Sequence, residues 1–296
     1  AAEPALRHPI DCCRPRLMLD LADAAAGGST VNVITLGGTA LEGVGIDSTV
    51  QKIRGGPREL QLTAYRDGTA ISFTGRVLPT VHPSFVLRAR RWTRAFHSDL
   101  SRAFRWFVAG LKWEDPEILY RPTAAQLEAW FERELGTDFL VYDVETLPGF
   151  PEWDHYDPMY DRLRYLGFSS TDGKRAVGIP FLYVADNRPV YSRVEGMVLV
   201  KCIKREFTAG RFRWAGQNSG YYDRQVIEHT FGVTPAPHTD LIGLHKMAEP
   251  ELPHGLGYIG SIHTDAPSWK DEFDAKMIKD DASMKIYNAR DCAITA

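Results

Sequence analysis

Two carboxylates stand one residue apart at the end of a short apolar stretch, F-L-V-Y-D-V-E-T-L, at residues 139–147. Its apolar and β-branched residues predict a buried strand. Because successive side chains of a strand point to opposite faces, Asp143 and Glu145 are expected to share one face. Two like charges held together favour a counter-charge, and divalent cations prefer carboxylate oxygens as ligands. Taken alone, a D-x-E pair is more often an exposed strand end with solvated acids.

Two further segments carry residue types that would complete a metal site. A polar loop with Gln217 and Asn218 precedes Asp223, which begins an amphipathic stretch predicted to be a helix. A negative charge in the first helical turn is favoured by the helix dipole, so Asp223 alone has a simple structural explanation. Later in the chain, Tyr287 and Asp291 are four residues apart. On a helix, this phenol and this carboxylate would lie on one face.

In chain order these segments read D-x-E-T, N-x-x-x-x-D and Y-x-x-x-D. Together they resemble the signature of DEDD-type 3′–5′ exonucleases, in the subclass that contains Tyr. Residues 238–270, which include P-E-L-P-H-G-L-G-Y-I-G-S-I-H-T-D-A-P-S-W-K, resemble the proofreading domain of phage and bacterial family A DNA polymerases. The resemblance extends roughly from Pro122 to the last residue. The extra residue between Asn218 and Asp223 is interpreted as a loop variation. The resemblance implies an α/β, RNase H-like fold, a mixed sheet flanked by helices.

The resemblance also implies a role for each acidic residue. Asp143 would bridge two divalent cations, Mg²⁺ or Mn²⁺, about 3.5–4 Å apart. Glu145 and Asp291 would complete the tighter of the two sites, and Asp223 would hold the looser one partly through waters. Tyr287 would orient the attacking water, because a phenol with a pKa of about 10 is a poor base at neutral pH. The implied reaction is hydrolysis of the 3′-terminal phosphodiester.

Residues beside the carboxylates are expected to bind DNA. Thr146 and Leu147 follow the carboxylate pair directly, and Leu147 is placed to wedge against the terminal base. Gln217 and Asn218 are expected to bind DNA as well, with Asn218 contacting the sugar-phosphate. The expected substrate is a single-stranded or frayed 3′ DNA end, since a mismatched terminus costs less to separate. The expected partner is a polymerase domain in the same polypeptide or replisome.

The front part of the chain has the opposite charge balance. Through Lys112 there are 15 Lys and Arg against 9 Asp and Glu, whereas the remainder has 20 against 29. The pattern of strand 31–36, the glycines that follow it and a helix is typical of α/β proteins. An Arg-rich helix is predicted over residues 88–110, with its arginines on a solvated face. Its core-facing residues are expected to be Trp92, Phe96, Leu100, Phe104 and Phe107.

Four segments of this front part look like the C-terminal half of bacterial iron-sulfur-type uracil-DNA glycosylases. They are C-R-P-R-L at 13–17, V-I-T-L-G-G-T-A at 33–40, I-R-G-G at 53–56 and L-P-T-V-H-P-S-F-V-L-R at 78–88. By resemblance, His82 would hydrogen-bond the uracil carbonyl, with Ser84 beside it. The following loop, which includes Leu87, would enter the minor groove. Cys13 matches one of four cluster ligands. The other three cysteines are missing, so no iron-sulfur cluster is expected in this chain.

We therefore expect a partial glycosylase-like α/β domain at residues 1–112, a linker at 113–122 and an exonuclease domain at 123–296. Four cysteines without disulfide spacing favour a reducing cytoplasm, and the lack of both an apolar run of membrane-spanning length and a signal peptide favours no membrane partner. The resemblance implies that this is a bacterial or phage-infected host cytoplasm. The chain lacks an initiating Met and is expected to be a piece of a longer protein. Two alternatives stay open: a non-catalytic DNA-binding or scaffold module for a replication protein, and uracil-DNA glycosylase activity through His82.

Overall fold

The computed structural model describes residues 9–25, 29–110, 113–149, 156–266, 269–272 and 280–296. The chain forms two compact units. Unit 1 comprises Ala1–Trp113 together with Ser261–Asp271, and unit 2 comprises Glu114–Gly260 together with Glu272–Ala296. Among the described residues, no helix combines the length and apolarity needed to cross a membrane.

Unit 2 is built on a six-stranded mixed sheet with the order β4-β7-β6-β5-β8-β9. Its strands are β4 (Glu117–Tyr120), β5 (Leu140–Leu147), β6 (Arg162–Ser169), β7 (Arg175–Pro180), β8 (Trp214–Gly216) and β9 (His238–Asp240). The meander β5-β6-β7 is antiparallel, and β8 and β9 add in parallel on the other side of β5. This strand order is that of the RNase H-like fold, so the predicted fold class is confirmed. β4 lies within the stretch that was expected to be a linker, and it pairs in parallel with β7.

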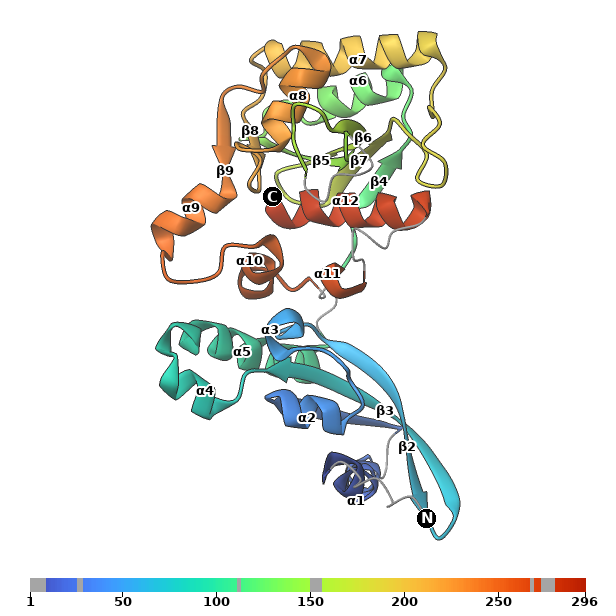
Figure 1. The fold of residues 1–296 in the computed structure, drawn as a ribbon, viewed down its shortest axis with the longest axis vertical. Helices are drawn as coiled ribbons and strands as arrows, with labels where there is room; N and C mark the ends of the chain where they lie inside the picture. Colours follow the sequence, from blue (N-terminus) through green and yellow to red (C-terminus); the bar gives the residue numbers. More distant parts are fainter. Residues whose placement is uncertain (1–8, 26–28, 111–112, 150–155, 267–268, 273–279) are drawn as a thin grey trace, which may run out of the picture. The chain divides into compact units, whose positions relative to one another are not determined.

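Helices cover both faces of this sheet (Figure 1). On one face, α6 (Ala124–Arg133), α7 (Arg193–Thr208) and α8 (Asp223–Phe231) share an apolar core with the sheet, including Phe131, Phe207 and Trp214. On the other face, α12 (Asp281–Thr295) packs across β5, β6 and β7. Thr123 caps α6 as predicted, because its side chain accepts a hydrogen bond from the backbone of Gln126.

Unit 1 contains a three-stranded sheet with the order β1-β3-β2. β1 (Thr30–Leu36) is parallel to β3 (Thr69–Thr80), and β2 (Arg58–Arg66) forms a hairpin with β3. Its helices are α1 (Pro9–Ala24), α2 (Gly38–Gly43), α3 (Val50–Ile53), α4 (Pro83–Arg88) and α5 (Thr93–Ala109), with a short 3₁₀ turn at Arg90–Trp92. The described residues also form α9 (Leu241–Ala248), α10 (Leu256–His263) and α11 (Trp269–Glu272).

The buried face of α5 differs from the predicted one. Phe104 was expected in the core but is 68% exposed, whereas Asp99 and Arg102 are buried. The predicted helix 88–110 is also interrupted, since Ala89 has an extended φ of −133° between α4 and the 3₁₀ turn. The buried stripe of α5 passes through Asp99 and Arg102 because they belong to a polar network in the interior of unit 1.

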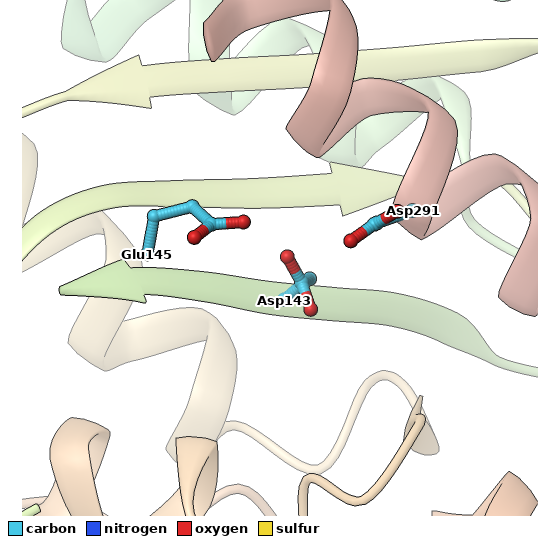
Figure 2. Close-up of side chains that lie close together, drawn as sticks. All are labelled: Asp143, Glu145 and Asp291. Atoms are coloured by element: carbon cyan, nitrogen blue, oxygen red, sulfur yellow. The ribbon is translucent and has the colours of Figure 1, made fainter. Parts of the chain in front are cut away.

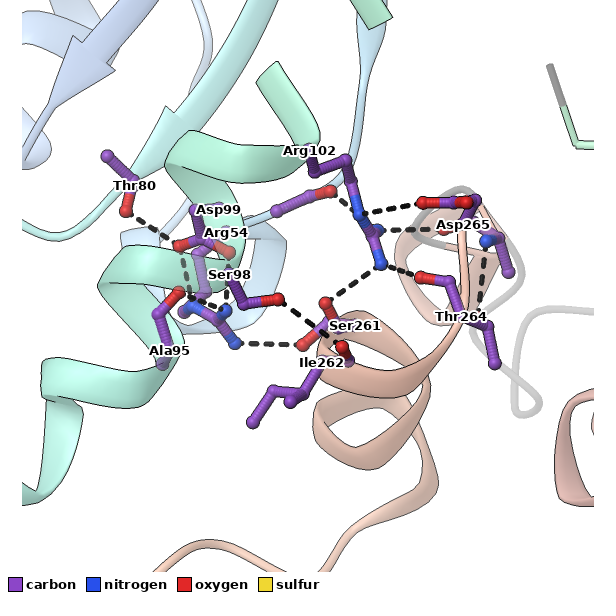
Figure 3. Close-up of polar contacts among 12 residues, drawn as sticks. Arg54, Thr80, Ala95, Ser98, Asp99, Arg102, Ser261, Ile262, Thr264 and Asp265 are labelled. Carbon is purple, nitrogen blue, oxygen red and sulfur yellow. Dashed lines mark hydrogen bonds and ion pairs between the residues drawn. The ribbon is translucent and has the colours of Figure 1, made fainter. Parts of the chain in front are cut away.

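This network joins α5 to the segment 261–266 (Figure 3). Arg102 donates hydrogen bonds to the carbonyls of Gly55 at 2.7 Å, Ser261 at 2.8 Å and Ala266 at 3.1 Å, and also to that of Thr264. Burial lowers the pKa of Arg102 to about 10, so the guanidinium remains charged at neutral pH. A cation at the C-terminal end of α10 is favoured by the helix dipole.

A second arginine completes the network. Arg54 pairs with the buried carboxylate of Asp99 and donates to the hydroxyl of Ser261 at 2.8 Å. Asp99 also accepts a hydrogen bond from Thr80 at 2.6 Å. The segment 261–266, which the sequence assigned to the domain 123–296, therefore packs as part of unit 1.

Candidate metal centre

Three carboxylates converge on one face of the sheet of unit 2 (Figure 2). Asp143 and Glu145 project from β5, and Asp291 projects from α12 toward them. One oxygen from each of the three lies within 4.8 Å of the other two. Asp291 is buried, whereas Asp143 and Glu145 are half-buried. Three negative charges at this separation form a donor set suited to a divalent cation.

The two-residue period of β5 explains this arrangement. Tyr142 and Val144 belong to the apolar core that the sheet shares with α6, α7 and α8. Val141 packs with Cys292 of α12, on the opposite face. The carboxylates therefore share the α12 face, as the sequence predicted. A register shift in the pairing of β5 with β6, between Glu145 and Thr146, ends the regular strand just after the pair.

Asp223 is placed beside these three carboxylates but not among them. It is the first residue of α8, and its Oδ1 accepts a hydrogen bond from the backbone N–H of Val144 at 2.9 Å. Burial raises the pKa of Asp223 to about 7, and the carboxylates of Asp240 and Asp291 add to the shift. The structure thus brings the predicted fourth acid to the end of β5, within electrostatic reach of Asp291.

Tyr287 lies on α12, one turn before Asp291, and is 7% exposed. Burial raises the pKa of its phenol far above the ordinary range, and the charges of Asp291, Glu145 and Asp143 raise it further. The phenol therefore keeps its proton at neutral pH and acts as a hydrogen-bonding group. A protonated phenol can donate a hydrogen bond to a water, and the orienting role of Tyr287 stays a prediction.

The buried thiol of Cys292 lies next to Asp291 on α12, close to the same acids. Burial raises its pKa well above the ordinary value, and four carboxylates raise it further: Asp143, Asp291, Asp223 and Glu145. The carboxylate of Asp223 therefore lies near the same interior region as the three converging carboxylates. The chemistry of this donor set, hard oxygens in excess of negative charge, fits Mg²⁺ or Mn²⁺.

One residue of this region was not identified from the sequence. Asn288 is fully buried on α12, and its Nδ2 donates a hydrogen bond to Oδ2 of Asp143 at 2.8 Å. Its only sequence signal is its place next to Tyr287, and neighbouring helical positions do not face the same way.

The residues predicted to bind DNA lie at the ends of β5 and β8. The hydroxyl of Thr146 is 2.6 Å from that of Tyr222, and Tyr222 also donates to the buried carboxylate of Asp161. Leu147 is the half-buried last residue of β5. These hydrogen bonds fix the exit of β5 relative to the start of α8, which carries the next predicted acid.

The backbone of the loop after β8 is fixed by hydrogen bonds to one carboxylate. Asp240 accepts hydrogen bonds from the backbone N–H groups of Asn218 and Gly220, both at 2.8 Å. Asn218 is exposed and has a left-handed φ of 58°. Gln217 donates to the carbonyl of His254 at 3.0 Å. The side chain of Asn218 is thus presented to solvent, while that of Gln217 is engaged within the protein.

The predicted glycosylase-like residues belong to unit 1. His82 caps α4, its Nδ1 accepting from the backbone of Ser84 at 3.1 Å and lying 2.7 Å from the Ser84 hydroxyl. Leu87 is 76% exposed. Beside His82 is a cavity of about 410 Å³, lined also by Gly37, Gly38, Ser48, Thr49, Val50, Gln51, Val81 and Phe85. His82 and Ser84 therefore stabilise one another, and the glycosylase role stays a prediction.

Comparison with known proteins gives similar solved structures but no family. No family model and no curated protein matches the chain. NrnC of Brucella melitensis, bound to pGG, is 18% identical with a TM-score of 0.41, over 61% of this chain and 76% of that one. RNase D of Escherichia coli, described as an exoribonuclease involved in structured RNA processing, is 14% identical with a TM-score of 0.44, over 60% and 42%. The catalytic core of RRP6 from Trypanosoma brucei is 16% identical with a TM-score of 0.42, over 84% and 61%. At these identities and TM-scores, the fold assignment rests on the strand order itself.

Proposed function

We propose that this protein is a metal-dependent 3′–5′ exonuclease that removes nucleotides from single-stranded or frayed DNA ends. The observation that carries the proposal is the convergence of Asp143, Glu145 and Asp291, with ligand oxygens within 4.8 Å of one another, and Tyr287 one helical turn before Asp291. Phosphodiester hydrolysis needs stabilisation of negative charge and a positioned water, and this constellation provides groups for both.

Each residue has a part in this proposal that follows from its position. Asp143, Glu145 and Asp291 would hold a divalent cation, and Asp223, at the start of α8, would bind a second one. When bound, such cations stabilise developing negative charge and lower the pKa of a coordinated water. Tyr287 positions the attacking water by a hydrogen bond, because its phenol stays protonated. The Asn288 amide and the Val144 N–H hold two of the carboxylates in place.

The substrate and context are part of the proposal. Leu147 would separate the terminal base, and Asn218, exposed on the loop after β8, would contact the sugar-phosphate. We also propose that the chain works with a family A polymerase domain as its proofreading part, in a bacterial or phage-infected cytoplasm. Unit 1 would be its basic companion, contacting DNA. These points are supported by the motif resemblance described above.

A degradation assay tests the proposal. A 5′-labelled single-stranded DNA and an RNA of the same sequence are incubated with the protein and Mg²⁺. DNA should shorten stepwise from its 3′ end, and EDTA should stop the reaction. Asp143→Ala should lower the rate by about 10³-fold or more, equivalent to about 4 kcal/mol of transition-state stabilisation. Asp138→Ala is the matched control, because this exposed acid precedes the same strand.

The other outcomes of the assay are equally informative. Faster degradation of RNA would reassign the substrate while keeping the metal centre. DNA binding without degradation would favour the scaffold alternative. Release of uracil from a labelled oligonucleotide, lost in His82→Ala and kept in Asp143→Ala, would favour the glycosylase alternative.

A further inference from the structure

The amide of Asn288 is buried in a way that stability alone does not explain. Asn288 is 0% exposed, and its Nδ2 donates to Oδ2 of Asp143 at 2.8 Å. Its Oδ1 is buried and has no hydrogen-bond partner among the described residues. A buried polar atom without a partner costs about 1–3 kcal/mol. An apolar side chain of the same size would avoid this cost, so the amide contributes something other than stability.

We propose that Asn288 is a positioning residue that orients the carboxylate of Asp143 for cation binding. The inference rests on the proposed function, since it presumes that Asp143 is a metal ligand. A donor on one oxygen of a carboxylate fixes the rotation of the whole group, so that both oxygens keep their directions before the cation arrives. Groups that orient metal ligands in this way typically change metal affinity or activity by about 10–100-fold when removed.

The strand that faces Asn288 is adapted to it. Gly167 of β6 pairs with Asp143 of β5. A β-carbon at Gly167 would lie 2.8 Å from Cγ of Asn288 and 2.8 Å from Sγ of Cys292, closer than real carbon contacts allow. The glycine therefore leaves the space that the amide occupies. Helix α12 and strand β6 both contribute to placing one amide group against Asp143.

A Mn²⁺ titration tests the proposal without relying on catalysis. Binding is followed by electron paramagnetic resonance of free Mn²⁺, for the wild type, Asn288→Leu and Asn288→Ala. Leu keeps the branching of Asn at Cγ and Ala does not, but both lack the donor. Both variants lose a buried oxygen that has no partner in the described part of the chain, and this loss offsets part of the cost of the substitution. Both are therefore expected to fold, which thermal unfolding checks. Asn32→Leu is the control, because this exposed residue of β1 lies in unit 1.

The expected result is a Mn²⁺ dissociation constant raised about 10–100-fold in both Asn288 variants and unchanged in Asn32→Leu. If either folded variant binds Mn²⁺ with wild-type affinity, the missing donor is not what weakens binding, and a loss in the other variant is a packing effect. That result would overturn the inference and leave the proposed function intact. No Mn²⁺ binding by the wild type would overturn the proposed function itself. Gly167→Ala tests the same contact from the strand, and it should weaken Mn²⁺ binding in the same direction.

Discussion

The Arg102→Met substitution is expected to destabilise unit 1 by about 3–5 kcal/mol. Arg102 is 1% exposed and donates to the carbonyls of Gly55, Ser261, Thr264 and Ala266. A hydrogen bond from a charged donor contributes about 1.5–3 kcal/mol, and removing one partner of a buried ionic network costs about 3–5 kcal/mol. The expected cost is smaller than the sum of four such bonds, because carbonyls at a helix end regain water when their donor is lost.

This cost is large compared with the 5–15 kcal/mol that stabilises a typical domain. Urea unfolding followed by Trp fluorescence should show it, because Trp92 and Trp106 are buried in unit 1. Amide hydrogen exchange should also become faster at residues 256–266, because the carbonyls of Ser261, Thr264 and Ala266 lose their donor.

Arg105→Met is the matched control for this experiment. Arg105 is on the same helix and pairs with Asp265 at 2.9 Å, but its side chain is 48% exposed. A surface ion pair contributes about 0–1 kcal/mol, so this variant should be close to the wild type. If Arg102→Met is no less stable than Arg105→Met, or if exchange at residues 256–266 does not change, the buried network does not hold this segment.

Three further outcomes are expected. Tyr222→Phe removes the hydroxyl that joins β5 to Asp161, so it should raise the KM for single-stranded 3′ ends by about tenfold with little change in kcat. Tyr221→Phe, at an exposed neighbouring residue, should leave the KM unchanged. Equal KM values for the two variants would contradict this role of Tyr222. Thr123→Ala should lower the free energy of unfolding of unit 2 by about 1 kcal/mol through loss of the α6 cap, measured by urea denaturation, and no loss would show that the cap is dispensable. Burial raises the pKa of Cys202 to about 11, and only the thiolate reacts with an alkylating agent. Alkylation of Cys202, followed by mass spectrometry, should therefore be much slower at pH 8 than alkylation of exposed Cys12. It should accelerate as the pH rises toward 11. Equal rates at pH 8 would contradict this.

The part of the metal centre that could be predicted from the sequence is the part set by local periodicity. The two-residue period of a strand places Asp143 and Glu145 on one face, and the 3.6-residue period of a helix brings Tyr287 and Asp291 together. Both relations depend on neighbouring residues alone. The convergence of the strand and the helix followed from the motif resemblance, and the structure places both acids of β5 next to Asp291.

The parts that could not be predicted depend on contacts between residues far apart in the chain. Asn288 faces Asp143 across 145 residues, and its only local feature is that it follows Tyr287. Arg102 looked like part of a solvated helix face, but its acceptors include carbonyls 159 and more residues later. The sequence contains no periodic signal for such pairings. For the same reason, the docking of residues 261–266 into unit 1 was not foreseen.

Anomalous diffraction from crystals grown with Mn²⁺ tests the central claim most directly. We expect a Mn²⁺ peak within about 2.2 Å of oxygens from Asp143, Glu145 and Asp291, and we expect this peak to be lost in crystals of Asp143→Asn. A Mn²⁺ peak elsewhere in an active protein, with none between these three carboxylates, would contradict it.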